Sequence, residues 1–378
     1  MALSWVSVNA NTGAIIADLP TLKVDGALKA TLMRYESQTA SLPTWDPASD
    51  DGPPPNWMSA TRPGATFLVA LSEPEPNEPR GLPLWGGMVI RRNRIPGAGV
   101  KMSLVTAEGY MDRVYVGSHT YTGGGQNGIV QQLADIYLKT TDTRRGLPLR
   151  VVTLPGANTP RDRTYDDSAD KTLYSVLTDL SGVIGGPEWT ITWEWVDEQR
   201  LGLVLTVGDR IGSPPPAGLN PNAQFYLPGN ISDKDGSVEL IEGYGADEGA
   251  NDVMAVSSGT EEARPQSPHQ TVTTDLRPRF EYRWTPSTSI TDIDTLTQHA
   301  QRALASMKDG SLALTLTANR EEAPKLGRDW FIGDDIGFSI EAPEFPGGLV
   351  GTARCVGWEL TDTTVTPLID VTNIEGGI

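Results

Sequence analysis

The sequence contains one cysteine, Cys355, among its 378 residues, so no intrachain disulfide can form. That excludes an extracellular scaffold held together by disulfides. The chain has no run of about 18 consecutive apolar residues, which argues against a membrane-spanning helix. Its start, MALSWVSVNANTGAIIADLP, lacks a basic segment followed by an apolar one, so no signal peptide is expected. We therefore expect synthesis in a reducing cytoplasm.

Basic residues are also scarce. The chain has 30 Lys and Arg against 48 Asp and Glu, a formal net charge of -18. Proteins that bind nucleic acids need a positive surface that displaces counterions from the phosphates. Nucleic-acid binding is therefore disfavoured, whereas an acidic surface that repels DNA and keeps the protein in solution is expected.

Histidine is rare, and the motifs of several enzyme classes are missing. The three histidines, His119, His269 and His299, lie far apart in the sequence. His299 borders the apolar side of an expected helix and is predicted to be a packed residue. The absence of H-E-x-x-H, C-x-x-C and G-K-[ST] leaves zinc hydrolase, redox and P-loop functions without support, so no cofactor is expected.

Turn-forming and aromatic residues, by contrast, are abundant. The 40 Gly and 29 Pro occur in clusters without a period, and the chain has ten Trp within an apolar fraction of 38%. This composition predicts a β-rich protein with many turns and a packed core. The length suggests two or three domains.

The first 120 residues predict strands separated by turns. Residues 4–8 and 13–20 flank the polar turn NANTG and predict a hairpin. Further strands are expected at residues 27–35, 65–73, 84–95 and 100–111. Residues 44–64 form a Pro-rich loop that cannot be a central strand.

The middle of the chain changes to a helical period. A helix is expected over residues 129–139, with Asn127 as its cap, and a second one beginning at YDDSAD, residues 165–170. The aspartates of that segment suit the positive end of the helix dipole. Residues 187–195 then predict a strand with one buried face, formed by Trp189, Ile191, Trp193 and Trp195.

The last third returns to strands, interrupted by a helix over residues 290–307. The apolar face expected for that helix consists of Ile293, Leu296, Ala300, Ala303, Leu304 and Met307. Residues 84–106 and 348–371 share a plan in which a Gly-bearing loop leads to a strand, a polar turn and another strand. This repeat fits two related small barrels that flank a helical insert.

Acidic residues cluster at DWFIGDDIGFSI, residues 329–340, with Asp329, Asp334 and Asp335. Gly-Asp-Asp before a strand is normal turn chemistry, because Asp side chains bond the nearby backbone. A similar phrase, VGDRIG, occurs at residues 207–212, where a hairpin is expected to end. The prediction is therefore a turn, with a catalytic pair of carboxylates as the alternative.

Two other motifs have competing interpretations. Residues 231–242 place Asp233, Asp235 and Glu242 at ligand positions of a calcium loop, but Ile231 occupies the first ligand position, which favours a hairpin turn. GGGQNG, residues 123–128, fits a dinucleotide-binding pattern, but the ribose-binding acid is missing from its expected place. A flexible entry into the helix is the preferred interpretation. SADK, residues 168–171, lacks the partner motifs of a serine acyl-enzyme.

Residues 277–284, RPRFEYRW, alternate arginines with aromatic residues. Base stacking beside cations would have this pattern, but so would a strand with one wet and one dry face. Because Arg and aromatic residues are enriched where proteins meet, we predict an interface role for Arg277, Arg279 and Arg283.

The order of several phrases resembles minor tail proteins of long-tailed phages that infect actinobacteria. These phrases are GAIIADLPTL, WGGMVIRRN, TAEGYMDR, GPEWTITWEW, GANDVMAVSSG and FIGDDIGFSIEAPEFPGG followed by ARCVGWEL, and they span nearly the whole chain. Such proteins look like the tail hub, the ring that closes the tail tube. The resemblance implies a β-rich α+β fold with two tube-type β-barrels and a smaller helix-containing insert. It carries over no catalytic residue.

The resemblance also implies a domain division and a set of partners. Residues 1–120 would form the first tube-type barrel, residues 121–230 a helix-containing α+β domain, and residues 231–378 the second barrel. Three chains would form a pseudo-hexameric ring at the tail tip of the virion. The expected partners are the distal tail protein, the tape measure protein and other minor tail or fibre proteins, while DNA passes through the lumen without specific binding. From the net charge of -18 we further expect that part of the negative charge faces this channel.

Two functions from other classes remain open on the sequence alone. A virion-associated carbohydrate-active enzyme would need two carboxylates in one cleft. A carbohydrate-binding receptor module could use Trp45 and Trp57 as stacking platforms. These two tryptophans are also candidates for contacts with neighbouring proteins, since they lie in or beside the long Pro-rich loop.

Overall fold

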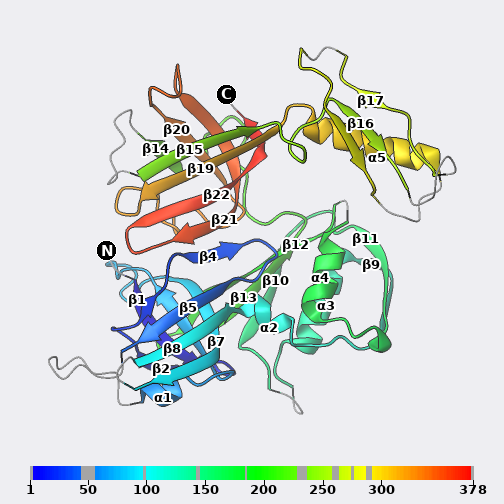
Figure 1. Cartoon of the computed structure of the whole chain (residues 1–378). Coiled ribbons are helices and arrows are strands. Elements are labelled where there is room, and N and C mark those ends of the chain that lie inside the picture. Colours follow the sequence, from blue (N-terminus) through cyan, green and yellow to red (C-terminus); the bar gives the residue numbers. More distant parts are fainter. Residues whose placement is uncertain are drawn as a thin grey trace. The chain divides into compact units, whose positions relative to one another are not determined.

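The computed structural model describes residues 3–43, 56–96, 99–141, 145–183, 185–227, 236–257, 264–273, 276–286 and 292–375. The chain forms two compact units. Unit 1 consists of residues 1–237 and 316–378, and unit 2 of residues 238–315. Figure 1 shows that most elements of the chain are strands. The predicted β-rich α+β class is confirmed.

The first sheet of unit 1 has seven strands. They are β1 (Ser4–Asn9), β2 (Ile15–Asp18), β3 (Lys23–Val24), β5 (Ser37–Leu42), β6 (Thr66–Leu71), β7 (Pro83–Ile95) and β8 (Gly99–Thr106). Their order is β2-β1-β6-β7-β8-β5-β3, and each neighbouring pair runs antiparallel. The predicted opening hairpin is β1–β2. The expected strand over residues 100–111 ends at Thr106, where the short helix α2 (Ala107–Met111) begins.

The middle of the chain adds a smaller α+β region. Its strands are β9 (His119–Gly125), β10 (Leu149–Thr153), β11 (Pro160–Tyr165), β12 (Glu188–Asp197) and β13 (Arg200–Gly208). Its helices are α3 (Gln126–Tyr137) and α4 (Leu173–Ser181), which lie side by side in Figure 1. The sheet order is β10-β13-β12, and β9 pairs with β11. One hydrophobic cluster contains residues of the first sheet, these helices and these strands, including Phe67, Val130, Leu177 and Trp189.

The two predicted helix starts need correction. Gly125 is the N-cap of α3, and Asn127 lies inside the helix with its side chain fully buried. The second helix does not begin at YDDSAD, since Thr172 caps α4 and accepts a hydrogen bond from the Ser175 amide. The aspartates instead surround a 3₁₀ turn, η1 (Asp167–Ala169), which Asp166 caps. An Asp side chain that bonds its own backbone favours such a turn over a helix interior. The GGGQNG segment leads directly into α3, as predicted.

The second large sheet comes mainly from the end of the chain. Its strands are β4 (Leu28–Thr31), β14 (Gln224–Leu227), β15 (Gly236–Gly243), β19 (Ser311–Asn319), β20 (Asp335–Ile340), β21 (Leu349–Leu360) and β22 (Thr364–Glu375). The order is β14-β20-β21-β22-β19-β15, and β4 pairs with β21. The two segments with a shared plan are the antiparallel hairpins β7–β8 and β21–β22. The finer prediction of two tube-type barrels and the three-domain division stay predictions.

Unit 2 has its own small core. Strands β16 (Asp252–Ala255), β17 (Gln270–Thr271) and β18 (Glu281–Trp284) form a sheet in the order β17-β16-β18, and helix α5 (Ile293–Met307) packs on it. The predicted apolar face of this helix is confirmed for every residue except Ile293, which is 54% exposed at the first turn. His299 packs edge-on against Trp284, with 5.4 Å between ring centroids.

The acidic cluster of Asp329, Asp334 and Asp335 belongs to the turn that leads into β20, as predicted, and this turn packs against the similar phrase at residues 207–212. Asp334 accepts hydrogen bonds from the amides of Ser213 at 2.7 Å and Phe331 at 2.9 Å. Asp335 pairs with Arg210 at 2.5 Å. A Cβ on Gly212 would lie 2.0 Å from the carbonyl carbon of Gly333, and both glycines have positive φ. The two turns therefore require glycine where they touch.

Next to the two turns, an ion pair joins Glu188 of β12 to Arg354 of β21. Arg354 donates two hydrogen bonds to the carboxylate of Glu188, and each side chain is 18% exposed. The same guanidinium donates to the Ile211 carbonyl at 2.8 Å and to the Gly333 carbonyl at 3.2 Å, while Glu188 accepts from the Ile211 amide at 2.7 Å. The pair thus joins the middle sheet, both turns and the second large sheet.

Arg354→Met should lower the free energy of unfolding by about 3 kcal/mol, because it leaves the Glu188 carboxylate and two carbonyls without their donor. Urea unfolding followed by tryptophan fluorescence measures this change. Arg200→Met is the matched control, since Arg200 and Asp197 form an exposed pair, and it should cost less than about 1 kcal/mol. Equal costs for the two variants would contradict the role assigned to Arg354.

Candidate functional site

An apolar cavity of about 310 Å³ lies in unit 1 beside strand β12. Its lining includes consecutive residues of β12, the start of β7, part of β4, Ala107 and Glu108 of α2, Trp358 of β21, and four residues of the loop before β20. We call this cavity the β12 groove. Its volume lies at the lower end of the range found for ligand pockets.

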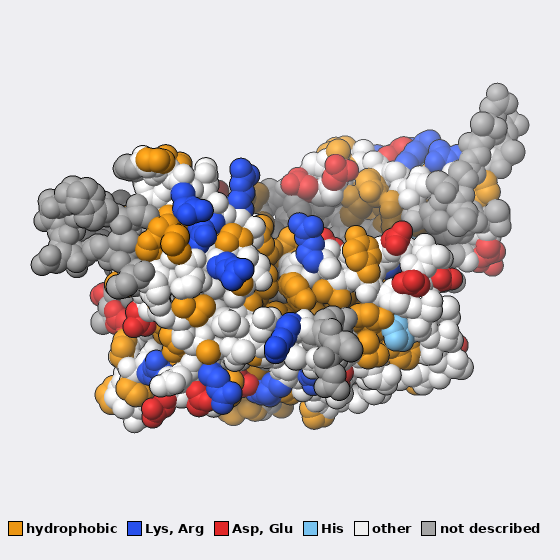
Figure 2. Space-filling model, turned by 90° about the horizontal axis from the view of Figure 1, so that it is seen from below, with side chains coloured by type: hydrophobic (Ala, Val, Ile, Leu, Met, Phe, Trp, Pro, Cys, Tyr) orange, Lys and Arg blue, Asp and Glu red, His pale blue; other side chains and the backbone are white. Residues whose placement is uncertain are grey.

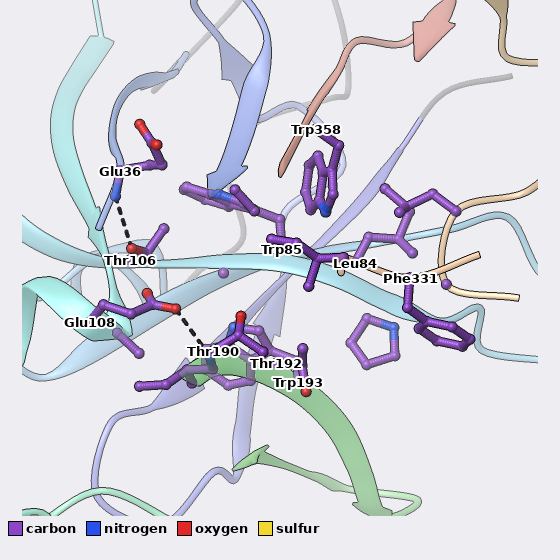
Figure 3. A pocket seen from close by; sticks show the side chains of 18 of the residues that line it. Glu36, Leu84, Trp85, Thr106, Glu108, Thr190, Thr192, Trp193, Phe331 and Trp358 are labelled. Carbon is purple, nitrogen blue, oxygen red and sulfur yellow. Dashed lines mark hydrogen bonds between the residues drawn. The ribbon is translucent and has the colours of Figure 1, made fainter. Parts of the chain in front are cut away.

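Aromatic side chains form much of the wall of the β12 groove. Trp85 of β7 and Trp358 of β21 are almost fully buried, whereas Phe331 remains 51% exposed. The indole N–H of Trp85 donates to the Lys29 carbonyl of β4 at 2.9 Å, which fixes that ring. In Figure 3 these rings lie across the groove from two carboxylates, Glu36 and Glu108. The groove therefore has an apolar side and an acidic side.

The acidic side is built around the start of α2. Glu108 lies in the first turn of that helix and is 7% exposed. Its Oε1 accepts a hydrogen bond from the Ile191 amide of β12 at 3.3 Å. Glu36 accepts from the Thr31 hydroxyl at 2.8 Å, and its own amide donates to Thr106 at 3.1 Å. Figure 3 marks the contacts that link Glu108 to β12 and Glu36 to Thr106.

Burial raises the pKa of Glu108 to about 7, with a further upward contribution from the nearby charge of Glu36. Hydrogen bonds from Thr106 and from the Ile191 amide oppose this shift without cancelling it. A carboxyl group that is half protonated near neutral pH inside a groove is typical of functional sites. The sequence contained no signal for this raised pKa, since Glu108 follows a strand in an ordinary helical turn.

The calcium alternative stays a prediction, because two of its three residues lie outside the described part of the chain. Asp233 and Asp235 lie outside the described residues, and Glu242 is an exposed residue of β15. Among the described residues, no group of three or more His, Cys, Asp or Glu side chains could hold a metal ion. The three residues stay a prediction.

The predicted interface residues lie in separate places. Trp45 is outside the described residues, and Trp57 begins helix α1 (Trp57–Ala60), where the Arg92 guanidinium lies 5.8 Å from its ring. Arg277 lies over the ring of Tyr244, 4.4 Å from its centroid, and Arg283 belongs to β18. Their interface role stays a prediction.

Arg279 belongs to a charged network in unit 2. It donates to Asp252 at 2.5 Å, and the same carboxylate bonds the Nδ1 atom of His269 at 2.5 Å. Burial favours protonation of Asp252, but the hydrogen bonds from His269 and Arg279 outweigh it and hold the pKa of Asp252 below its usual value. Arg279 thus provides a hydrogen bond and a positive charge to the buried carboxylate of Asp252 within unit 2.

Comparison with known proteins gives structural neighbours only. No protein-family model and no curated protein matches the sequence. The structure is similar to a tail protein from Neisseria meningitidis MC58, with a TM-score of 0.55 and 14% identity over 97% of each chain. It is also similar to a 43 kDa tail protein of prophage MuSo2 from Shewanella oneidensis, with a TM-score of 0.55 and 11% identity over 97% of this chain and 98% of that one.

The chain has the fold of these phage tail proteins. The resemblance to phage tail proteins seen in the sequence is thus confirmed at the level of the fold, while an actinobacterial host stays a prediction. Among the described residues, no helix is both long and apolar enough to span a membrane.

Glu108→Gln should remove a pH-dependent loss of stability. The pKa of Glu108 is about 7 in the folded state but has its ordinary value of 4.5 in the unfolded chain, so the wild type loses stability as pH rises between these values. The loss should reach about 3 kcal/mol at most. Glutamine keeps an acceptor for the Ile191 amide and carries no charge.

The measurement is the difference in unfolding free energy between Glu108→Gln and wild type from pH 4 to pH 8. The free energy of unfolding of the variant, relative to that of the wild type, should rise across this window and then stay constant. Glu198→Gln, at an exposed position, is the control and should follow the wild type. A constant difference for Glu108→Gln would show that the carboxyl titrates normally.

Proposed function

We propose that this chain is a structural protein of a phage tail and that it acts by assembly and not by catalysis. The observation that carries the proposal is the shared fold with two tail proteins over nearly the full length of all three chains. The catalytic alternative to the predicted turn gains no support, because Asp334 and Asp335 are engaged in turn and ion-pair contacts.

Within the tail, we propose the position of the hub at the tip. The two seven-stranded sheets would be the tube-type barrel modules, each built around a long hairpin, β7–β8 or β21–β22. Three chains would then supply six modules, which suits a ring that continues a hexameric tube. This assignment places the protein at the tail tip of the virion after synthesis in the host cytoplasm.

A hub needs partners on both sides. We propose that the chain binds copies of itself in a homotrimer, the distal tail protein, the tape measure protein and other minor tail or fibre proteins. Exposed large apolar side chains such as Tyr226 and Val350 are candidates for such contacts, since both are about 60% exposed on neighbouring parts of one sheet. Tyr226 and Val350 flank Ser339 in the register of β14, β20 and β21.

The proposed ring encloses a channel, and the net charge of the chain affects how that channel interacts with DNA. Figure 2 shows one face on which Lys and Arg side chains are interspersed with acidic and apolar ones, so the charge of -18 is not spread as a uniform negative field. We propose that part of the negative charge lines the channel, where it would let DNA pass without specific binding. A ring structure with a neutral or basic lumen would contradict this arrangement.

Light scattering of the purified protein at several concentrations tests the ring. A species near three times the chain mass of 40.7 kDa is expected. A dimer or a tetramer would exclude a threefold hub.

Gold-labelled antibodies against the chain, applied to intact virions, test the position. Label at the tip end of the tail is expected. Label along the tail tube or at the capsid would exclude the hub position. If the protein were also a strict monomer in solution, the threefold ring would be excluded as well. An unrelated antibody of the same class is the control for non-specific attachment.

A further inference from the structure

Strand β12 has a free backbone edge. It is the last strand of the β10-β13-β12 sheet, so among the described strands it pairs with β13 alone. The Val207 carbonyl of β13 accepts from the Leu154 amide, on the side away from β12. Because backbone groups alternate along a strand, the β12 residues opposite such positions, Trp189, Ile191, Trp193 and Trp195, direct their peptide groups away from β13.

Part of this free edge already has partners, and part of it has none. The Trp189 carbonyl accepts from the Met33 amide at 3.2 Å, and the Ile191 amide donates to Glu108. Beyond that point, the Ile191 carbonyl and the amide and carbonyl of Trp193 have no hydrogen-bond partner among the described residues. Unpaired strand edges of this kind bind other strands.

The β12 groove runs along this edge. Its lining contains every residue from Thr190 to Trp195. The facing wall includes residues 83–86 of β7, which precede the point where β8 begins to pair with that strand, at Gly87. Trp85, Trp358 and the exposed ring of Phe331 line the same space. An unpaired edge beside an apolar cavity suits an extended peptide, whose backbone pairs while alternate side chains enter the cavity.

The acidic side of the groove indicates one feature of the occupant. Neither Glu36 nor Glu108 forms an ion pair among the described residues. The other charged residues of the lining are Glu194, which pairs with Arg150 at 2.5 Å, and Arg34, which is exposed. A cationic side chain placed beside Glu36 and Glu108 would gain charge-assisted hydrogen bonds.

We propose that the β12 groove binds an extended segment of another protein as an added strand on β12. The segment places apolar side chains against Trp85, Trp358 and Phe331, and a Lys or Arg against Glu36 and Glu108. A small ligand would use the apolar wall but would leave the Ile191 and Trp193 peptide groups unsatisfied. The inference rests on the groove itself and holds whether or not the chain is a tail hub.

Binding of synthetic peptides tests the proposal. The probes are pools of acetylated, amidated heptapeptides with one Lys and with Val, Ile, Leu, Thr or Phe at the other positions, offered to the full chain at up to 1 mM. We expect retention of a subset with Lys at a fixed place. The best peptide should slow hydrogen exchange within residues 188–197, because the Trp193 amide becomes paired.

Three matched controls separate backbone pairing from simple burial. Replacing the peptide lysine by glutamate should weaken binding about tenfold, the usual effect of losing a hydrogen bond between charged groups. The Glu36→Gln/Glu108→Gln variant should lose most of that preference. Methylating alternate backbone nitrogens of the peptide on the edge that faces β12 should abolish binding, whereas methylating the opposite set should not.

Several results would overturn the proposal. One is that no pool is retained, and another is that the two N-methylated peptides bind equally well. Retention of phenethylamine with no preference for peptides would reassign the cavity to a small ligand. Protection of residues 188–197 that grows with the concentration of the protein alone would assign the groove to a second copy of this chain.

Discussion

The bidentate pair between Arg354 and Glu188 is the interaction on which the arrangement of unit 1 depends. Its partners belong to segments far apart in sequence, namely β12, β21 and the turns at residues 207–212 and 329–340. Because both side chains are largely withdrawn from water, each needs the other and the surrounding carbonyl and amide groups. Three of the elements that this network joins, β12, β21 and the turn before β20, also line the β12 groove, so these contacts help to shape the groove.

Local sequence signals predicted most individual elements. The alternation of Trp189, Ile191, Trp193 and Trp195 identified β12, and apolar spacing identified α3, α4 and α5. These predictions were correct because the periodic spacing of apolar side chains and the effect of turn residues involve only a few neighbouring residues in the sequence. The predicted start of α4 was wrong for the same reason. Both Thr172 and the preceding aspartates are suitable caps, and the local sequence does not decide between them.

Long-range pairing could not be read from the sequence. Strand β4 comes from the first 31 residues and yet pairs with β21 near the end of the chain. The environment of Glu108 depends on β12, 83 residues further along, and on the burial that this strand creates. The predicted turn at Asp334 was correct, but nothing in its local pattern showed that the similar phrase at residues 207–212 would lie against it. Contacts of this kind follow from the whole fold.

The route by which the chain enters and leaves unit 2 has a consequence for changes in the length of that segment. It enters along β15 and returns along β19, and these strands are hydrogen-bonded neighbours in one sheet. Gly236 lies against Thr317, and Gly243 against Ser311. To the rest of the sheet, unit 2 is equivalent to the loop of a hairpin, and the entropy of closing such a loop grows only slowly with its length. Lengthening, shortening or replacing the segment between the two strands should therefore cost the sheet little, provided that a turn still joins β15 to β19.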